Sequence, residues 1–237
     1  MNRYIPNQHG AWVMLILPFL FGLVAFGGQS LHILLFISWL LLYLLSFPVL
    51  QWIKTGKAYK YRQPALVYAG LSIPVLSLLL ICQPDLIGYG IFLGICFVLN
   101  MYYARTRNER ALINDMIAIV MFCSFIYPVM YLGRTTDWRL ATNLFVIAAL
   151  YFVGTALYVK TMLRERGNVH YYIGSIFYHI VICGLVSWMH IGLIISFALL
   201  LLRSIILPHF KLKSKHVGII EICFAVLLYV SITILYS

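Results

Sequence analysis

The side chains that could do chemistry gather where the chain enters and leaves its apolar runs. Asn100, Tyr103 and Arg107 are spaced i, i+3, i+7, and Gln51 and Lys54 are spaced i, i+3, so each set would share one helix face. Cations that converge on one mouth would suit a phosphate or diphosphate head group. The alternative is that these lysines and arginines only orient the chain and reach toward lipid phosphate.

A second polar segment lies just before the first apolar run, where Asn7, Gln8 and His9 precede Gly10 and Trp12. Amide and imidazole groups could bond a head group here, although the start of a helix with an interfacial Trp would look the same. The full predicted binding set is Gln8, His9, Trp12, Gln51, Lys54, Asn100, Tyr103, Arg107, Asn114, Asp115, Lys160 and Arg164.

Three further polar residues lie inside apolar runs, where they are costly and therefore candidates for function: His179, Arg203 and Glu221. Arg203 and Glu221 fall at similar predicted depth, so we expect an ion pair, whereas an unpaired Glu would handle protons or cations. No other histidine matches the depth of His179, which argues against haem and for a hydrogen-bonded core histidine.

Recognisable catalytic motifs are not found: the sequence has no P-loop, no H-E-x-x-H and no G-x-S-x-G. The 5 cysteines lie inside apolar runs without a C-x-x-C spacing, as small apolar helix residues do. We predict no metal site and no cofactor, and no catalytic residue is assigned.

Composition identifies the elements that must position these residues. Apolar types make up 63% of the 237 residues and charged types 10%, against roughly 25% charged in a soluble domain. The sequence therefore predicts an integral membrane protein, and it excludes a cytosolic enzyme, a secreted disulfide scaffold and a disordered segment.

Apolar runs long enough to cross a bilayer, about 20 residues each, recur along the chain. We predict an all-α transmembrane bundle that forms one domain over residues 1–237, with nine spans near 9–27, 31–53, 65–82, 86–103, 112–132, 139–160, 170–188, 191–207 and 217–236. A tight hairpin at Met189-His190 is expected to divide the longest run. Gly90 and Gly94 form a G-x-x-x-G step that predicts close helix packing.

The 17 Lys and Arg against 6 Asp and Glu give a net charge of +11, carried by short loops between the runs. Nine spans with the N-terminus inside leave only Arg134 and Arg139 outside, so we predict an N-in, C-out topology. Basic loops of this kind face anionic lipid, and nucleic acid is not expected as a partner.

The segment Pro6-Asn7-Gln8-His9-Gly10-Ala11-Trp12-Val13-Met14 resembles the signature of the YwiC-like family of bacterial integral membrane proteins. The resemblance implies a multi-pass protein of the bacterial inner (cell) membrane, without implying a particular activity.

The predicted arrangement also resembles the UbiA prenyltransferase superfamily, in which nine helices enclose a cytoplasmic-side cavity. Tyr103 to Arg107 is similar to its Tyr-x-x-x-Lys/Arg element, and Arg62-Gln63-Pro64-Ala65-Leu66 is similar to its Arg-Pro-Leu stretch. The Asp-rich motifs that hold Mg²⁺ there are missing, because the loop between spans two and three has no carboxylate and the loop between spans six and seven has only Glu165. Mg²⁺ is therefore not supported.

These observations predict a membrane protein that binds an isoprenoid, a quinone-type molecule or an anionic lipid at a cytoplasmic-side cavity, as a divergent UbiA-like transferase would. In that case Asp115 or Glu221 would be the nearby base. The alternatives are a small-solute or lipid transporter, for which Ser175, His179 and Asn143 are the midplane polar groups, and a non-catalytic partner of a membrane complex.

Overall fold

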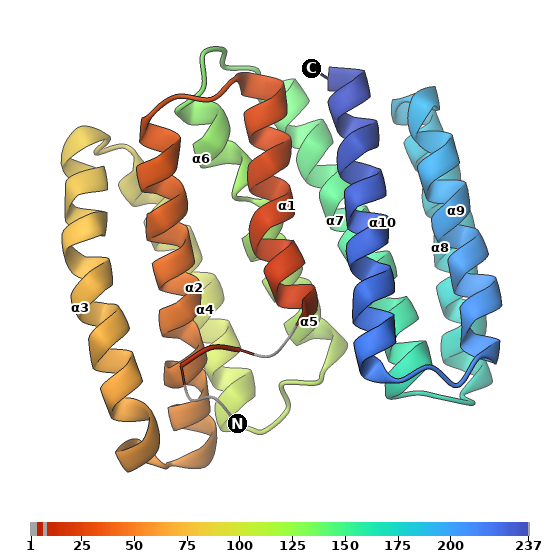
Figure 1. The fold of residues 1–237 in the computed structure, drawn as a ribbon, viewed down its shortest axis with the longest axis horizontal. Helices are drawn as coiled ribbons and strands as arrows, with labels where there is room; N and C mark the ends of the chain where they lie inside the picture. Colours follow the sequence, from red (N-terminus) through yellow and green to blue (C-terminus); the bar gives the residue numbers. More distant parts are fainter. Residues whose placement is uncertain (1–3, 7–8, 237) are drawn as a thin grey trace. The chain divides into compact units, whose positions relative to one another are not determined.

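The computed structural model describes residues 4–6 and 9–236, and in that part of the chain the secondary structure is entirely helical (Figure 1). The elements are α1 (His9–Phe26), α2 (Leu31–Thr55), α3 (Ala58–Cys82), α4 (Leu86–Arg105), α5 (Leu112–Cys123), α6 (Ile126–Tyr131), α7 (Trp138–Leu163), α8 (Val169–Met189), η1 (Ile191–Leu193), α9 (Ile194–Ile206), η2 (Leu207–His209) and α10 (Ser214–Tyr236).

Among the described residues, 8 helical segments are long and apolar enough to cross a membrane, and α1 is a shorter apolar helix. At 18 residues, α1 would extend about 27 Å, close to the thickness of the hydrocarbon core of a bilayer. The prediction of an all-α, multi-pass membrane bundle is confirmed.

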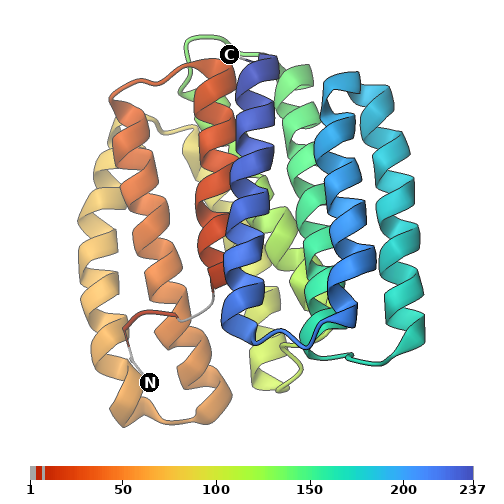
Figure 2. The ribbon, with the colours of Figure 1, turned by 45° about the vertical axis from the view of Figure 1, so that its right-hand side comes forward.

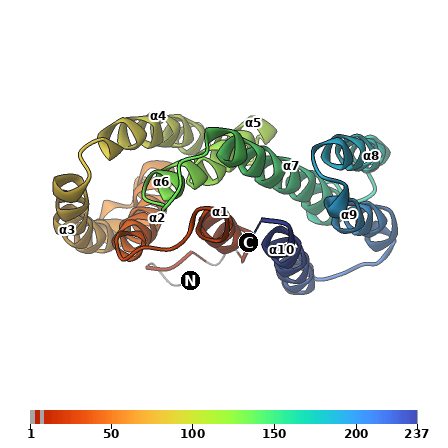
Figure 3. The same cartoon turned by 90° about the horizontal axis from the view of Figure 1, so that it is seen from above.

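The chain divides into two compact units. Unit 1 comprises residues 1–8 and 26–136, in which α2 packs against α3 and α4, and α4 packs against α5. Unit 2 comprises residues 9–25 and 137–237, in which α8 packs against α7 and α9, and α10 packs against α7 and α9 (Figures 2 and 3).

Short turns place the basic loops of each unit at one end of that unit. In unit 1 the α2–α3 turn and the α4–α5 loop lie at the same end, and in unit 2 the α7–α8 and α9–α10 loops do (Figure 1). The α2–α3 turn is Gly56-Lys57, where Gly56 has φ 68° and its N–H donates to Trp52 O at 2.8 Å. A glycine at this left-handed position ends α2 without steric cost.

Two helices differ from the predicted spans. The third span begins at Ala58, so Arg62 and Pro64 are helical and do not form a loop. The predicted span 112–132 is broken into α5 and α6 at Ser124-Phe125. Pro128 explains the break, because it has no N–H to donate to the Ser124 carbonyl, which instead accepts from Tyr127 N at 3.0 Å.

The hairpin expected at Met189-His190 is present. His190 is extended, with φ −157°, between α8 and η1, and its Nδ1 accepts from Gly192 N at 3.2 Å. Since Nδ1 caps the new helical segment, His190 both ends α8 and starts the next crossing.

Candidate functional sites

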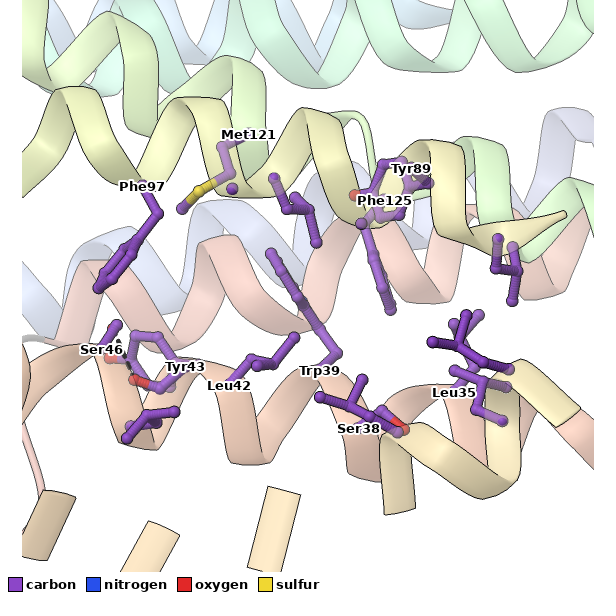
Figure 4. A pocket seen from close by; sticks show the side chains of 18 of the residues that line it. Leu35, Ser38, Trp39, Leu42, Tyr43, Ser46, Tyr89, Phe97, Met121 and Phe125 are labelled. Carbon is purple, nitrogen blue, oxygen red and sulfur yellow. Dashed lines mark hydrogen bonds between the residues drawn. The ribbon is translucent and has the colours of Figure 1, made fainter. Parts of the chain in front are cut away.

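Unit 1 contains an apolar cavity of about 390 Å³ (Figure 4). Side chains of α2, α3, α4 and α5 and the α5–α6 junction line it: Leu35, Ser38, Trp39, Leu42, Tyr43, Leu45, Ser46, Leu76, Leu79, Leu80, Leu86, Ile87, Tyr89, Gly90, Leu93, Gly94, Phe97, Met121, Phe122 and Phe125. Among the described residues, no carboxylate, Lys or Arg is in this lining. The cavity suits an apolar molecule, and its volume falls within the range of small-molecule sites.

One wall of the cavity is built from aromatic rings. Trp39 stacks on Phe125 with ring centroids 4.5 Å apart, and Tyr43 meets Phe122 edge-on at 6.0 Å. The hydroxyl groups of Tyr89 and Ser124 lie 3.2 Å apart and bond each other. Because Ser124 and Phe125 form the break between α5 and α6, this wall includes both the aromatic stack and the interrupted helix.

Gly90 and Gly94 line the same cavity, and this overturns the packing predicted for them. A Cβ added at either position would meet nothing within 4 Å in the described chain. The small side chains therefore leave space instead of admitting a neighbouring helix.

None of the predicted binding residues whose side chains the structure describes lines this cavity. The cavity involves α2 from Leu35 to Ser46, whereas Lys54 lies further along α2, toward the end of the unit that carries the α2–α3 turn and the α4–α5 loop. The sequence gives no signal for such a cavity, because its aliphatic and aromatic lining has the composition of an ordinary helix interface.

At the basic end of unit 1, several predicted residues are bound to their own chain. Lys54 Nζ donates to Glu109 Oε1 in an ion pair that the sequence analysis missed. Asn114 Nδ2 donates to Glu109 O at 3.0 Å, and Asn100 Nδ2 donates to Cys96 O at 2.9 Å. Gln51, Tyr103 and Asp115 are half-buried.

Arg107 does not continue the helix face of Asn100 and Tyr103, as the spacing predicted. α4 ends at Arg105, and Arg107 has φ 56°, the left-handed conformation that favours glycine. Asn108 N donates to Tyr103 O at 2.9 Å, and Arg107 N donates to Ala104 O at 3.2 Å. This is a Schellman helix end with an exposed arginine at the usual glycine position.

The remaining predicted binding residues divide as follows. Trp12 is half-buried on α1, Lys160 is buried on α7 and Arg164 is exposed at its end, all in unit 2. Gln8 and the side chain of His9 lie outside the described residues. A common mouth formed by both units therefore stays a prediction.

The ion pair expected between Arg203 and Glu221 is present inside unit 2. Arg203 Nη1 lies 2.6 Å from Glu221 Oε2, and both side chains are at most 6% exposed. The guanidinium also lies over the rings of Tyr158 and Phe224, at 4.3 Å and 4.9 Å from their centroids. Aromatic faces attract a desolvated cation, so Arg203 has stabilising neighbours besides Glu221.

His179 is a buried histidine with one ring nitrogen in use. Its Nδ1 lies 2.7 Å from Ser175 O. A carbonyl only accepts, so Nδ1 carries the proton of the neutral ring and Nε2 presents a lone pair. Nε2 has no hydrogen-bond partner among the described residues.

The described residues contain no group of three or more His, Cys, Asp or Glu side chains that could hold a metal ion. Three residues of α7 that were not predicted from the sequence adjoin the Arg203–Glu221 pair: Tyr151, Thr155 and Tyr158. Their i, i+4, i+7 spacing inside an apolar run was a signal that could have found them.

The helical bundle and its intramembrane ion pair define a polytopic membrane protein. A family model described as YwiC-like protein matches residues 5–131, and the chain belongs to the YwiC-like family. It is 38% identical over 182 residues to the "Uncharacterized protein YwiC" of Bacillus subtilis (strain 168), covering 77% of this chain and 76% of that one. It is 32% identical over 225 residues to an "Uncharacterized protein" of Haemophilus influenzae (strain ATCC 51907 / DSM 11121 / KW20 / Rd), covering 93% of each. No solved structure matches the chain.

Proposed function

We propose that this protein binds the chain of an isoprenoid or quinone-type lipid in the cavity of unit 1, within the bacterial inner (cell) membrane. The single observation that carries the proposal is the apolar cavity of about 390 Å³ with a wall of aromatic rings. The uncharged lining favours an isoprenoid over an anionic lipid, and it favours binding over a UbiA-like transfer reaction.

The binding energy must come from shape, because a lipid already in the bilayer gains little by exchanging one apolar surrounding for another. A branched, unsaturated isoprenoid chain fits irregular aromatic walls better than a flexible straight acyl chain. The space beside Gly90 and Gly94 is central to this fit, since no described side chain fills it.

The experiment compares Gly90→Leu with Gly88→Leu in phospholipid nanodiscs that contain a quinone with a four-unit prenyl tail. Both glycines lie on α4 with open space around them, but only Gly90 lines the cavity. We expect the wild type and Gly88→Leu to retain the quinone after purification. Gly90→Leu should retain at least tenfold less, measured by mass spectrometry.

Retention of bulk phospholipid alone by the wild type would contradict the proposal. Equal quinone retention by the wild type and Gly90→Leu would contradict it as well. Gel filtration of both variants checks that they are folded.

A lipid transporter is the second candidate, favoured by the break between α5 and α6 at the cavity wall. Interrupted helices are typical of transport sites. Its test is the redistribution of a fluorescent prenyl lipid across reconstituted vesicles. Transport that is fast in the wild type and slow in Gly90→Leu would support this function, and equal rates with and without protein would exclude it.

A further inference from the structure

We propose that unit 2 contains a proton-binding site inside the membrane, in which Glu221 accepts the proton and bound water delivers it beside Arg203 and His179. This site is independent of the lipid cavity, which lies wholly in unit 1.

The site rests first on the buried polar atoms around the Arg203–Glu221 pair. Among the described residues, hydrogen-bond partners are missing for Thr155 Oγ1, Tyr158 Oη, Ser175 Oγ, His179 Nε2, Arg203 Nε, Arg203 Nη2 and Glu221 Oε1. An unsatisfied polar group in a bilayer is strongly unfavourable, so a cluster of them requires water or another polar ligand.

Donors and acceptors occur together among these atoms. Arg203 offers Nε–H and Nη2–H, whereas Glu221 Oε1 and His179 Nε2 offer lone pairs. The hydroxyl of Thr155 lies close enough to the Glu221 carboxylate to interact with it, and it could donate either to that carboxylate or to water. Water suits such a mixed set because it donates and accepts, whereas an anion would face two lone pairs.

Arg203 stays stabilised when Glu221 is neutral. A hydronium ion passes its proton to Oε1 and leaves as water. The carboxylate becomes a neutral carboxyl group, and Arg203 keeps its charge. The rings of Tyr158 and Phe224 then still flank the guanidinium. A buried pair without such neighbours would leave an isolated cation, which is strongly unfavourable.

Titratable and charged side chains approach Glu221 from the helices packed around it. Tyr151 and Tyr158 on α7 and Arg203 on α9 lie close enough to interact with it electrostatically. His179 on α8 is within electrostatic reach of Arg203. The segment η1, which also contacts α10, is Ile191–Leu193 and contributes no titratable group.

The test is infrared spectroscopy of the full chain in nanodiscs, titrated with pH in H₂O and in D₂O. We expect a protonated-carboxyl band that titrates, shifts in D₂O and is lost in Glu221→Gln. His179→Gln should move the titration midpoint by about one pH unit, since the two sites share the same water. The matched control is Ser196→Ala, which also removes a hydrogen bond between α9 and α10. Ser196 Oγ and Ser231 Oγ lie 2.7 Å apart, and neither belongs to the proposed site, so this variant should leave the band unchanged.

The proposal is overturned if the wild type shows no titrating carboxyl band, or if the band persists in Glu221→Gln. It is also overturned if the band does not shift in D₂O, because the site would then be closed to water. His179→Gln keeps the ion pair, so it tests the site even if Glu221→Gln fails to fold. An unchanged midpoint in that variant would exclude His179 from the site.

Discussion

Lys54 and Glu109 form an ion pair that joins the end of α2 to the loop after α4. The pair lies at the basic end of unit 1, where Lys54 was predicted to bind an anionic head group. Its charge is already compensated by Glu109, so any anion at this position would have to compete with a carboxylate of the same chain.

We predict that Glu109→Gln changes the stability of the protein by less than about 1 kcal/mol, because both side chains are roughly one-third exposed and such pairs are weak. The variant should instead increase binding of anionic lipid, since it frees Lys54. Native mass spectrometry in mixtures with an anionic phospholipid measures this binding. The double variant with Lys54→Gln should return it to the wild-type level, and a persistent increase would show that Lys54 is not responsible.

Arg107→Gly should stabilise the protein by about 1 kcal/mol, because glycine adopts the left-handed conformation at φ 56° without the penalty that a side chain incurs. Arg107→Ala keeps this penalty while it also removes the charge, so it should give no such gain. Arg105→Gly, inside α4, should destabilise by a similar amount. Thermal unfolding of the three variants distinguishes these effects. Equal stabilisation by Arg107→Ala would assign the gain to charge.

Gly133→Ala should be strongly destabilising. A Cβ at position 133 would lie 2.7 Å from Phe26 Cβ and 2.9 Å from Phe26 O, so backbone would have to move. Overpacking of this kind costs about 1–3 kcal/mol. Gly88→Ala, which meets open space on α4, should instead be neutral or stabilising. The measurement is the midpoint of thermal unfolding, and an unshifted midpoint for Gly133→Ala would show that Gly133 and Phe26 do not approach closely.

His32→Phe should destabilise unit 1 by about 1–3 kcal/mol for each polar group that it leaves unsatisfied. Nε2 of His32 donates to Val129 O at 2.9 Å, and Nδ1 accepts from Gln29 N at 2.9 Å. The matched control is His170→Phe, an exposed histidine that should tolerate the change. Limited proteolysis of the loop before α2 gives the measurement, and equal cleavage of the two variants would contradict the expected role of His32.

Composition and turn residues were sufficient to predict the membrane bundle, the hairpin at His190 and the pairing of Arg203 with Glu221. Hydropathy alone did not reveal that α3 begins at Ala58, because Lys60 and Arg62 look like loop residues. The break before α6 depends on a proline that many transmembrane helices tolerate. The cavity was not predictable either, since Gly90 and Gly94 have the same sequence pattern whether they face a helix or open space.

The tight turn at Gly56-Lys57 has a consequence for biosynthesis. The two residues between α2 and α3 are too short to hold the end of α2 in place while α3 is being synthesised. The two helices must enter the bilayer together as a hairpin. A ribosome-stalled chain that ends soon after α2 should therefore be incompletely inserted, and each residue added to the turn should relax this requirement.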